Sequence, residues 1–318
     1  MVLLALAVLN MIFVRDDLAE TQVEQLFPGL KPELARRIQI TAPGGETASL
    51  VLDDEGLWTV EERFGWRAYQ PAVDSLLRGL SGAKTSEREA TSSSSHAALG
   101  VDAETANHIR VGGADGELLA DLLQGSPPEN RRGSRVLVVG QDSVYRTANV
   151  PRVVPDPSRL IDSDLLSLDA NEVQSITLQL RITGSVRQDA VTLGRRDDGR
   201  FDLIDSERSL PPAAVSPFLG GLESLVAKDV VAGPELDVAG PGVAAALVVQ
   251  FELGGGQAGS IAIGYEDPFG VPPPQEGAVY AAVGGVGAEP GQLVWFALPV
   301  SSANRLLGLA NELLQRTL

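Results

Sequence analysis

The chain has 318 residues, of which 44% are apolar, and this is enough for two domains that each bury a core. Its formal net charge of −17 argues against general affinity for phosphate backbones or anionic lipid head groups, so we expect no nucleic-acid partner. The absence of cysteine excludes disulfides, thiolate catalysis and Cys-ligated zinc.

An apolar run occupies Met1–Val14, with Asn10 as its single polar residue. As a helix it would be about 21 Å long, short of the ~30 Å hydrocarbon core of a bilayer. Three interpretations stay open: a signal-peptide core, a core helix of the folded domain, and most of a membrane anchor whose first residues lie upstream of this start. We favour the anchor, because the run is apolar on every face and because the polar, acidic segment Arg15–Glu24 after it resembles an exposed stalk. The expected membrane contact is therefore residues 1–14.

The rest of the chain contains an internal repeat. Ile38–Val60 and Ile176–Ile204 both predict a strand, a turn, a second strand, an acidic turn and a third strand. A glycine follows the acidic pair in each copy, Gly56 in the first and Gly199 in the second. The two stretches therefore predict the same β-structure twice.

Each copy then changes to a helical period, over Pro71–Leu80 and Ala213–Leu222. Apolar residues at i, i+3, i+4 and i+7 predict a helix lying on a sheet. These residues are Val73, Leu76, Leu77 and Leu80 in the first copy, and Val215, Phe218, Leu219 and Leu222 in the second. Loops of small residues are expected next, at Ser92–Ser95 and Gly240–Gly242.

Further strands are expected after each loop. They are His108–Val111, Leu118–Leu123, Val136–Val139 and Val144–Tyr145, then Leu247–Leu253, Ile261–Ile263, Val279–Val283 and Leu293–Phe296. Asp267–Gly277 is predicted to be a surface loop, and Ser301–Leu318 an amphipathic helix that Ser301 or Ser302 can cap.

The predicted fold class is α+β: two tandem repeats, each an antiparallel β-sheet with a packed helix, preceded by an N-terminal apolar helix. We expect residues 1–19 to form an anchor helix and stalk, residues 20–160 the first repeat and residues 161–318 the second.

Two acidic pairs, Asp53–Asp54 and Asp197–Asp198, are the clearest candidates for acid–base chemistry. Both pairs come just before a glycine between two strand-like runs, which is typical of hairpin turns. We therefore interpret them as turn residues and keep a carboxylate-dependent hydrolase only as an unfavoured alternative.

Other candidate residues have structural interpretations. His96 and His108 lack metal-ligand spacing, and the glycines of Gly254–Gly256 and Gly284–Gly285 precede no phosphate-binding motif, so they predict turns. Ser92–Ser95 forms no nucleophile elbow. Four aromatic residues are expected in cores or on sheet faces: Trp58, Trp66, Trp295 and Tyr145. A ligand-stacking role is kept open chiefly for Trp66. We assign no catalytic, cofactor-binding or metal-ligating residue and expect no cofactor.

Several stretches in order resemble a bacterial domain-of-unknown-function family, number 4340. They are LFPGL at Leu26–Leu30, the strands of Ile38–Val60, the helix Val73–Leu80, Lys84–Thr85, Ala97–Asp102 and the joint Arg159–Ile176. The resemblance covers roughly residues 26–180; Leu160 stands where the family pattern has Trp.

The resemblance implies a single-pass inner-membrane protein whose folded part lies in the periplasm. Many such proteins accompany ABC-type transporter genes, including those tied to gliding motility, so transporter subunits are expected partners. The family has no assigned catalytic residues. We therefore expect a non-catalytic accessory or interaction module, with a small-ligand-binding module as the alternative.

Overall fold

The computed structural model describes most of the chain. The described residues are 23–126, 133–180, 190–204, 206–232, 246–264, 279–285 and 293–317. The expected anchor Met1–Val14, the loop Gly240–Gly242 and the surface loop Asp267–Gly277 lie outside them. Within the described ranges, no helix is both long enough and apolar enough to cross a membrane.

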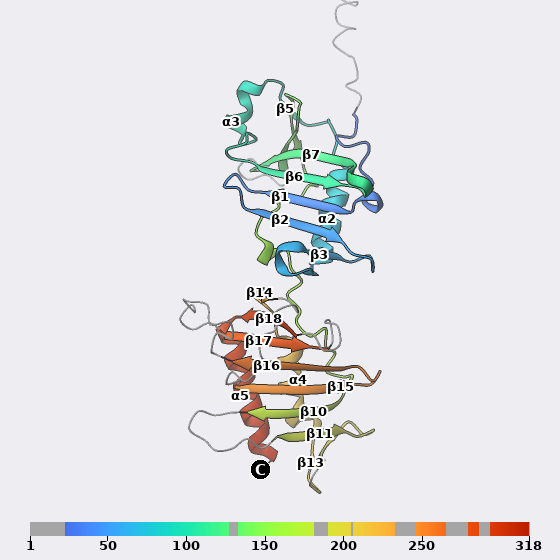
Figure 1. The fold of residues 1–318 in the computed structure, drawn as a ribbon, viewed down its shortest axis with the longest axis vertical. Coiled ribbons are helices and arrows are strands. Elements are labelled where there is room, and N and C mark those ends of the chain that lie inside the picture. Colours follow the sequence, from blue (N-terminus) through green and yellow to red (C-terminus); the bar gives the residue numbers. More distant parts are fainter. Residues whose placement is uncertain are drawn as a thin grey trace, which may run out of the picture. The chain divides into compact units, whose positions relative to one another are not determined.

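Within the described residues, the strands form two antiparallel sheets of nine strands each (Figure 1). The first sheet holds β1 (Arg37–Thr41), β2 (Thr47–Leu52), β3 (Trp58–Val60), β4 (Trp66–Arg67), β5 (Arg88–Ala90), β6 (Asn107–Gly112), β7 (Leu118–Gly125), β8 (Ser134–Val138) and β9 (Val144–Thr147). The second holds β10 (Val173–Leu180), β11 (Val191–Arg195), β12 (Phe201–Leu203), β13 (Ser209–Leu210), β14 (Asp229–Ala232), β15 (Leu247–Leu253), β16 (Ala258–Gly264), β17 (Val279–Gly284) and β18 (Leu293–Leu298).

Strand order is the same in both sheets. It is β4-β3-β2-β1-β6-β7-β8-β9-β5 in the first sheet and β13-β12-β11-β10-β15-β16-β17-β18-β14 in the second. Each strand of the first sheet therefore has a counterpart at the same place in the second. The predicted α+β class with two repeat-like halves is confirmed.

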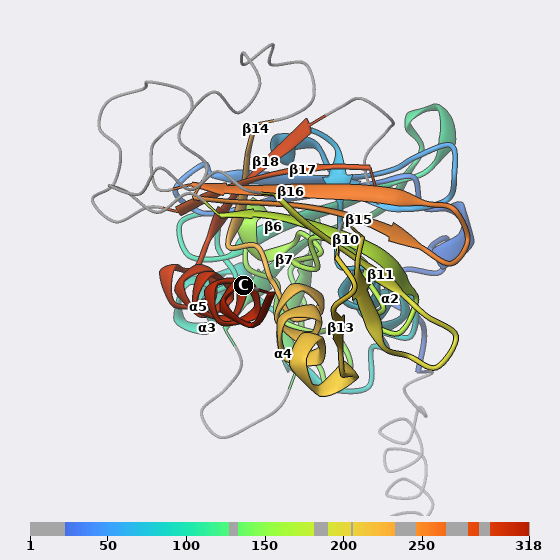
Figure 2. The ribbon, with the colours of Figure 1, turned by 90° about the horizontal axis from the view of Figure 1, so that it is seen from below.

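The two helices predicted from the apolar stripes are present. They are α2 (Gln70–Ser81) and α4 (Pro212–Glu223), and all eight stripe residues are buried. Each helix lies in the chain between the two edge strands of its sheet, β4 and β5 or β13 and β14. The C-terminal helix α5 (Val300–Thr317) lies with α4 on one side of the second sheet (Figure 2).

Short helical segments complete the description. They are α3 (His96–Leu99) and the 3-10 turns η1 (Pro32–Leu34), η2 (Glu61–Arg63), η3 (Ser93–Ser95), η4 (Ala114–Gly116) and η5 (Pro157–Arg159).

Two local expectations were wrong. Ser93–Ser95 is helical because the Ser92 hydroxyl accepts the amide of Ser94 at the start of η3. Helix α5 begins at Val300, so Ser301 and Ser302 lie inside its first turn and do not cap it.

The chain divides into two compact units, and the division does not follow the sequence order. The first unit comprises Met1–Ala48 and Pro71–Pro155. The second comprises Ser49–Gln70 and Asp156–Leu318. Strands β3 and β4 thus belong to the second unit, although they follow β2 in the strand order of the first sheet.

Alternation along the central strands separates a buried face from an open one. Ile176 and Leu178 of β10 are fully buried, whereas Ser175 and Thr177 between them are partly exposed. Since successive strand residues point to opposite faces, the open face of the second sheet lies opposite its apolar core. Polar side chains such as those of Ser175 and Thr177 therefore lie on this open face.

Candidate functional site

The acidic pairs lie in the two equivalent hairpin turns. Asp53 Oδ1 accepts the backbone N–H groups of Glu55 and Leu57 at 3.0 and 2.8 Å, which closes the turn between β2 and β3. Gly56 adopts a φ of 82°, a left-handed conformation that glycine adopts without steric cost. The carboxylate of Asp53 is thus engaged by the turn itself.

The second pair repeats this arrangement between β11 and β12. Asp198 Oδ1 accepts the backbone N–H of Arg200 at 3.0 Å, and Gly199 has a φ of 80°. Asp197 and Asp198 are both exposed. The interpretation of these pairs as turn residues is confirmed.

The two histidines lie on different elements. His96 in α3 bonds through Nε2 to the backbone oxygen of Asp142 at 2.9 Å. His108 in β6 contacts Asp121 of β7, with 2.5 Å between Nε2 and Oδ1. Among the described residues, no group of three or more His, Cys, Asp or Glu side chains is placed to hold a metal ion.

The glycine-rich turn and the aromatic residues considered above are parts of the folded structure. Gly254–Gly256 forms the turn between β15 and β16, where Gly256 has a φ of 77°. All four aromatic residues considered above are buried: Trp58, Trp66, Tyr145 and Trp295. The ligand-stacking role kept open for Trp66 is wrong, because its side chain is only 6% exposed.

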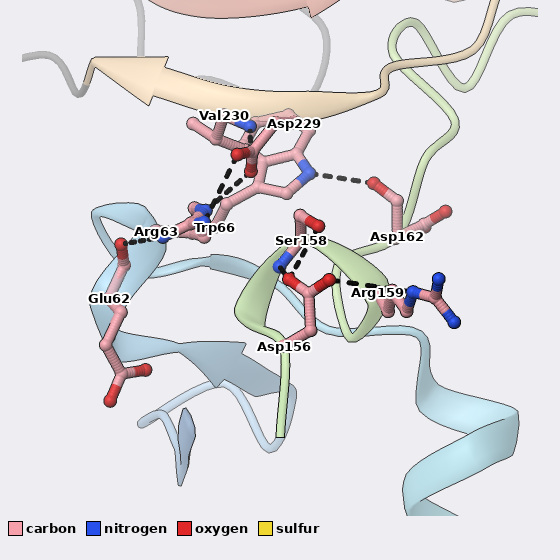
Figure 3. A network of polar contacts seen from close by, with 9 residues as sticks. All are labelled: Glu62, Arg63, Trp66, Asp156, Ser158, Arg159, Asp162, Asp229 and Val230. Carbon is pink, nitrogen blue, oxygen red and sulfur yellow. Dashed lines mark hydrogen bonds and ion pairs between the residues drawn. The ribbon is translucent and has the colours of Figure 1, made fainter. Parts of the chain in front are cut away.

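Trp66 instead belongs to a polar network within the second unit (Figure 3). Its indole Nε1–H donates to the backbone oxygen of Asp162 at 2.9 Å. Its ring meets that of Phe296 edge to face, with 4.8 Å between centroids. Arg67 stacks over the Trp66 ring, with 5.1 Å between its guanidinium carbon and the ring centroid. Its Nε also lies 3.1 Å from Asp162 Oδ2.

An ion pair joins η2 to β14 in the same network (Figure 3). Arg63 donates from Nε to Asp229 Oδ1 at 2.5 Å and from Nη2 to Asp229 Oδ2 at 3.2 Å. A bidentate contact of this kind fixes the relative orientation of the two side chains in addition to pairing their charges. Together with Trp66, it fastens the segment 49–70 to the rest of its unit, and we interpret the network as structural.

A hollow of about 420 Å³ opens on the second sheet. Its lining comes from four adjacent strands and the turn after β17: Ser175, Thr177, Gln250, Phe251, Glu252, Ala258, Gly259, Ser260, Gly284 and Gly285. The volume falls within the about 300–1,000 Å³ that is usual for small-molecule sites. The hollow is therefore the best candidate for a binding site among the described residues.

Short side chains explain why the hollow exists. Strand pairing places Thr177, Gln250, Ser260 and Gly284 in one row across β10, β15, β16 and β17. Each of these side chains except glutamine is small or absent, so the row leaves space above the sheet.

The first sheet has the same row, filled differently. Its members on β1, β6, β7 and the residue after β8 are Gln39, Arg110, Asp121 and Val139. Arg110 and Asp121 form an ion pair, with 3.7 Å between Nε and Oδ2. The paired side chains of Arg110 and Asp121 thus stand where the second sheet has Gln250 and Ser260, and Val139 stands where it has Gly284.

Hydrogen-bonding groups surround the hollow, and one of them is charged. The Ser175 hydroxyl donates to Glu252 Oε2 at 3.1 Å, and the Thr177 and Thr192 hydroxyls lie 3.1 Å apart. Glu252 is the only charged residue among the described residues of the lining. The arrangement can accept hydrogen bonds and counter a positive charge.

The sequence holds only a weak signal for this site. Ser175, Gln250 and Ser260 lie in strands where polar residues interrupt apolar ones, which indicates that one face of the sheet is exposed. Their convergence depends on the registers of three strand pairs, which periodicity does not determine.

Comparison with known proteins places the chain in a family but supplies no activity. No curated protein and no solved structure matches it. A family model matches residues 58–242, which is more than half of the chain. The matched range includes strand β3, helices α2 and α4 and the joint between the repeats. The chain therefore belongs to DUF4340, a family described as a domain of unknown function.

Proposed function

We propose that this protein is a non-catalytic, membrane-anchored accessory or interaction module, with an association to an ABC-type transporter. In this proposal residues 1–14 form an apolar helix in the inner membrane as a single pass. The two α+β repeats, each with a helix packed on its sheet, follow it in the periplasm.

The observation that carries the proposal is the place of the acidic pairs. The carboxylates of Asp53 and Asp198 each accept backbone amides in turns at the ends of hairpins. They are used to shape the chain, and they lie in separate turns. This gives no support to the hydrolase alternative, whereas two similar sheets with open faces suit a protein that presents surfaces to partners.

Anchoring is supported by the apolar sequence of residues 1–14, and fractionation tests it. The full chain, expressed in a Gram-negative bacterium, should remain with membranes after a carbonate wash. Introducing Leu4→Arg with Val8→Arg should release it, because each charge opposes insertion by about 2.5–3.5 kcal/mol at a helix centre. A matched variant, Leu4→Ile with Val8→Leu, should stay with the membranes.

Deletion of residues 1–14 separates the anchor from a core helix. We expect the shortened protein to be released in folded form, with unchanged circular dichroism and unfolding midpoint. Loss of folding on this deletion would place the run in a core and overturn the anchor. Protease added to spheroplasts should degrade the full chain if its folded part lies in the periplasm.

The partner proposal has its own test. A tagged full chain, crosslinked in membranes and captured, should bring down ABC-type transporter subunits. Capture without them, from membranes that contain the transporter, would contradict this association and leave the anchor unaffected.

A second candidate function, small-ligand binding, is favoured by one specific observation. The hollow on the second sheet has a volume and a polar lining that suit a small molecule.

A further inference from the structure

We propose that the hollow of the second sheet binds a small molecule through a primary ammonium group. The inference deepens the second candidate function above and rests on it. The site would consist of Glu252 as the counter-charge, with Ser175, Gln250 and Ser260 as hydrogen-bonding partners.

The charge of the lining is the first argument. Glu252 brings a carboxylate to the hollow, and no described Lys, Arg or His lines it. Described residues form no ion pair with Glu252, whose carboxylate accepts a hydrogen bond from the hydroxyl of Ser175. An anion would be repelled here, whereas an ammonium group would find a charge-assisted hydrogen bond.

Comparison of the two repeats is the second argument. In the first sheet, the equivalent row carries its own cation: Arg110 lies against Asp121, and His108 contacts the other oxygen of that carboxylate. In the second sheet the positions of Arg110 and Asp121 are taken by Gln250 and Ser260. Both charges of that ion pair are thus absent from the second row, and Glu252, two residues beyond Gln250 in β15, meets no cation among the described residues, so a ligand can supply one.

Chemical selectivity follows from the remaining lining. The hydroxyls of Ser175, Thr177 and Ser260 and the amide of Gln250 can accept or donate hydrogen bonds to further polar groups of the ligand. The lining also includes Gly259, Gly284 and Gly285, which add no side-chain volume to the hollow. An amine with a short polar or aliphatic chain fits these groups.

Calorimetric titration of the full chain tests the proposal with three probes of equal backbone length. We expect 1,4-diaminobutane to bind saturably, and 1,4-butanediol and succinate to bind at least tenfold more weakly. Equal binding of the diol would overturn the ammonium requirement. Absence of heat from the diamine, confirmed by unchanged melting temperature, would overturn the site.

Variants locate the binding. Glu252→Gln keeps an acceptor for Ser175 but removes the charge, so diamine affinity should fall about tenfold or more. Ser260→Leu fills the hollow and should abolish binding. Glu223→Gln, on the exposed side of α4, changes the net charge equally and should leave affinity unchanged.

Two results would contradict the assignment. One is an equal loss in Glu252→Gln and Glu223→Gln, which would show attraction to the acidic surface as a whole. The other is unchanged binding in both Glu252→Gln and Ser260→Leu, with circular dichroism confirming that both are folded. Neither result depends on membrane attachment or on a transporter partner, so the failure of those proposals is distinguishable from the failure of this one.

Discussion

At the scale of single residues, Trp66 combines three interactions in one side chain. It is almost completely buried, it donates to the Asp162 backbone, and it packs against Phe296, which has 0% exposure. An aromatic ring buried in this way contributes both apolar area and edge-to-face contact. Trp66 therefore contributes more to the stability of the fold than the backbone pairing of the two-residue strand β4 suggests.

Trp66→Ala should lower the free energy of unfolding of the second unit by about 3–5 kcal/mol, because it leaves a cavity beside Phe296. Trp66→Phe should cost about 1–3 kcal/mol, since the ring is kept but the Asp162 oxygen loses its donor. Urea unfolding followed by circular dichroism measures both. The control is Tyr69→Ala, a nearby aromatic residue that is 52% exposed, which should change stability by less than about 0.5 kcal/mol. Equal effects of Trp66→Ala and Tyr69→Ala would contradict this account.

At the scale of the elements, the repeat preserves one glycine on the buried side of each helix. Gly79 of α2 and Gly221 of α4 both follow the third stripe residue by two positions. A Cβ on Gly79 would lie 2.4 Å from the backbone oxygen of Asn149, and one on Gly221 would lie 2.9 Å from Leu309 Cδ1 of α5. At both glycines the helix therefore lies so close to its neighbour that a Cβ atom would clash with it.

The nature of the obstacle predicts different costs. Gly79→Ala should destabilise the protein by about 1–3 kcal/mol, because the backbone of Asn149 must shift. Gly221→Ala should cost less, since a leucine side chain can rotate away. Gly220→Ala, at a position with nothing within 4 Å, should stabilise by about 0.5–1 kcal/mol through helix propensity. Thermal unfolding of the three variants measures the order; Gly79→Ala as mild as Gly220→Ala would show that the close approach is absent.

Periodicity predicted the elements that have a regular pattern and missed those that depend on distant partners. Helices α2 and α4 and strand β15 were predicted within a few residues, because their apolar residues recur at 3.6 or 2 positions. Strands β5 and β14 were missed, since these short segments become strands only by pairing with β9 and β18. The acidic turns were predicted from local chemistry, whereas the hollow requires four strands in register and escaped prediction.

At the scale of the whole molecule, the grouping of residues into compact units differs from their order along the chain. Segment 49–70 lies in the second unit, although it falls between two parts of the first. Trp66, Arg63 and Arg67 make the contacts that hold it there. A destabilising substitution in this segment should therefore lower the local stability of residues that are far away in sequence.

Hydrogen exchange followed by mass spectrometry can locate that disturbance. Trp66→Ala should raise exchange in β14, β18 and the segment 156–166, because their amides lose the packing of Trp66 and depend on the stability of the second unit. The matched variant is Leu122→Ala, which removes a side chain fully buried in β7 of the first unit. It should raise exchange in β6, β7 and β8 and leave β14 and β18 near their original rates. If Trp66→Ala instead raised exchange only in β6, β7 and β8, segment 49–70 would be energetically part of the first unit, and the grouping derived from the contacts would be wrong.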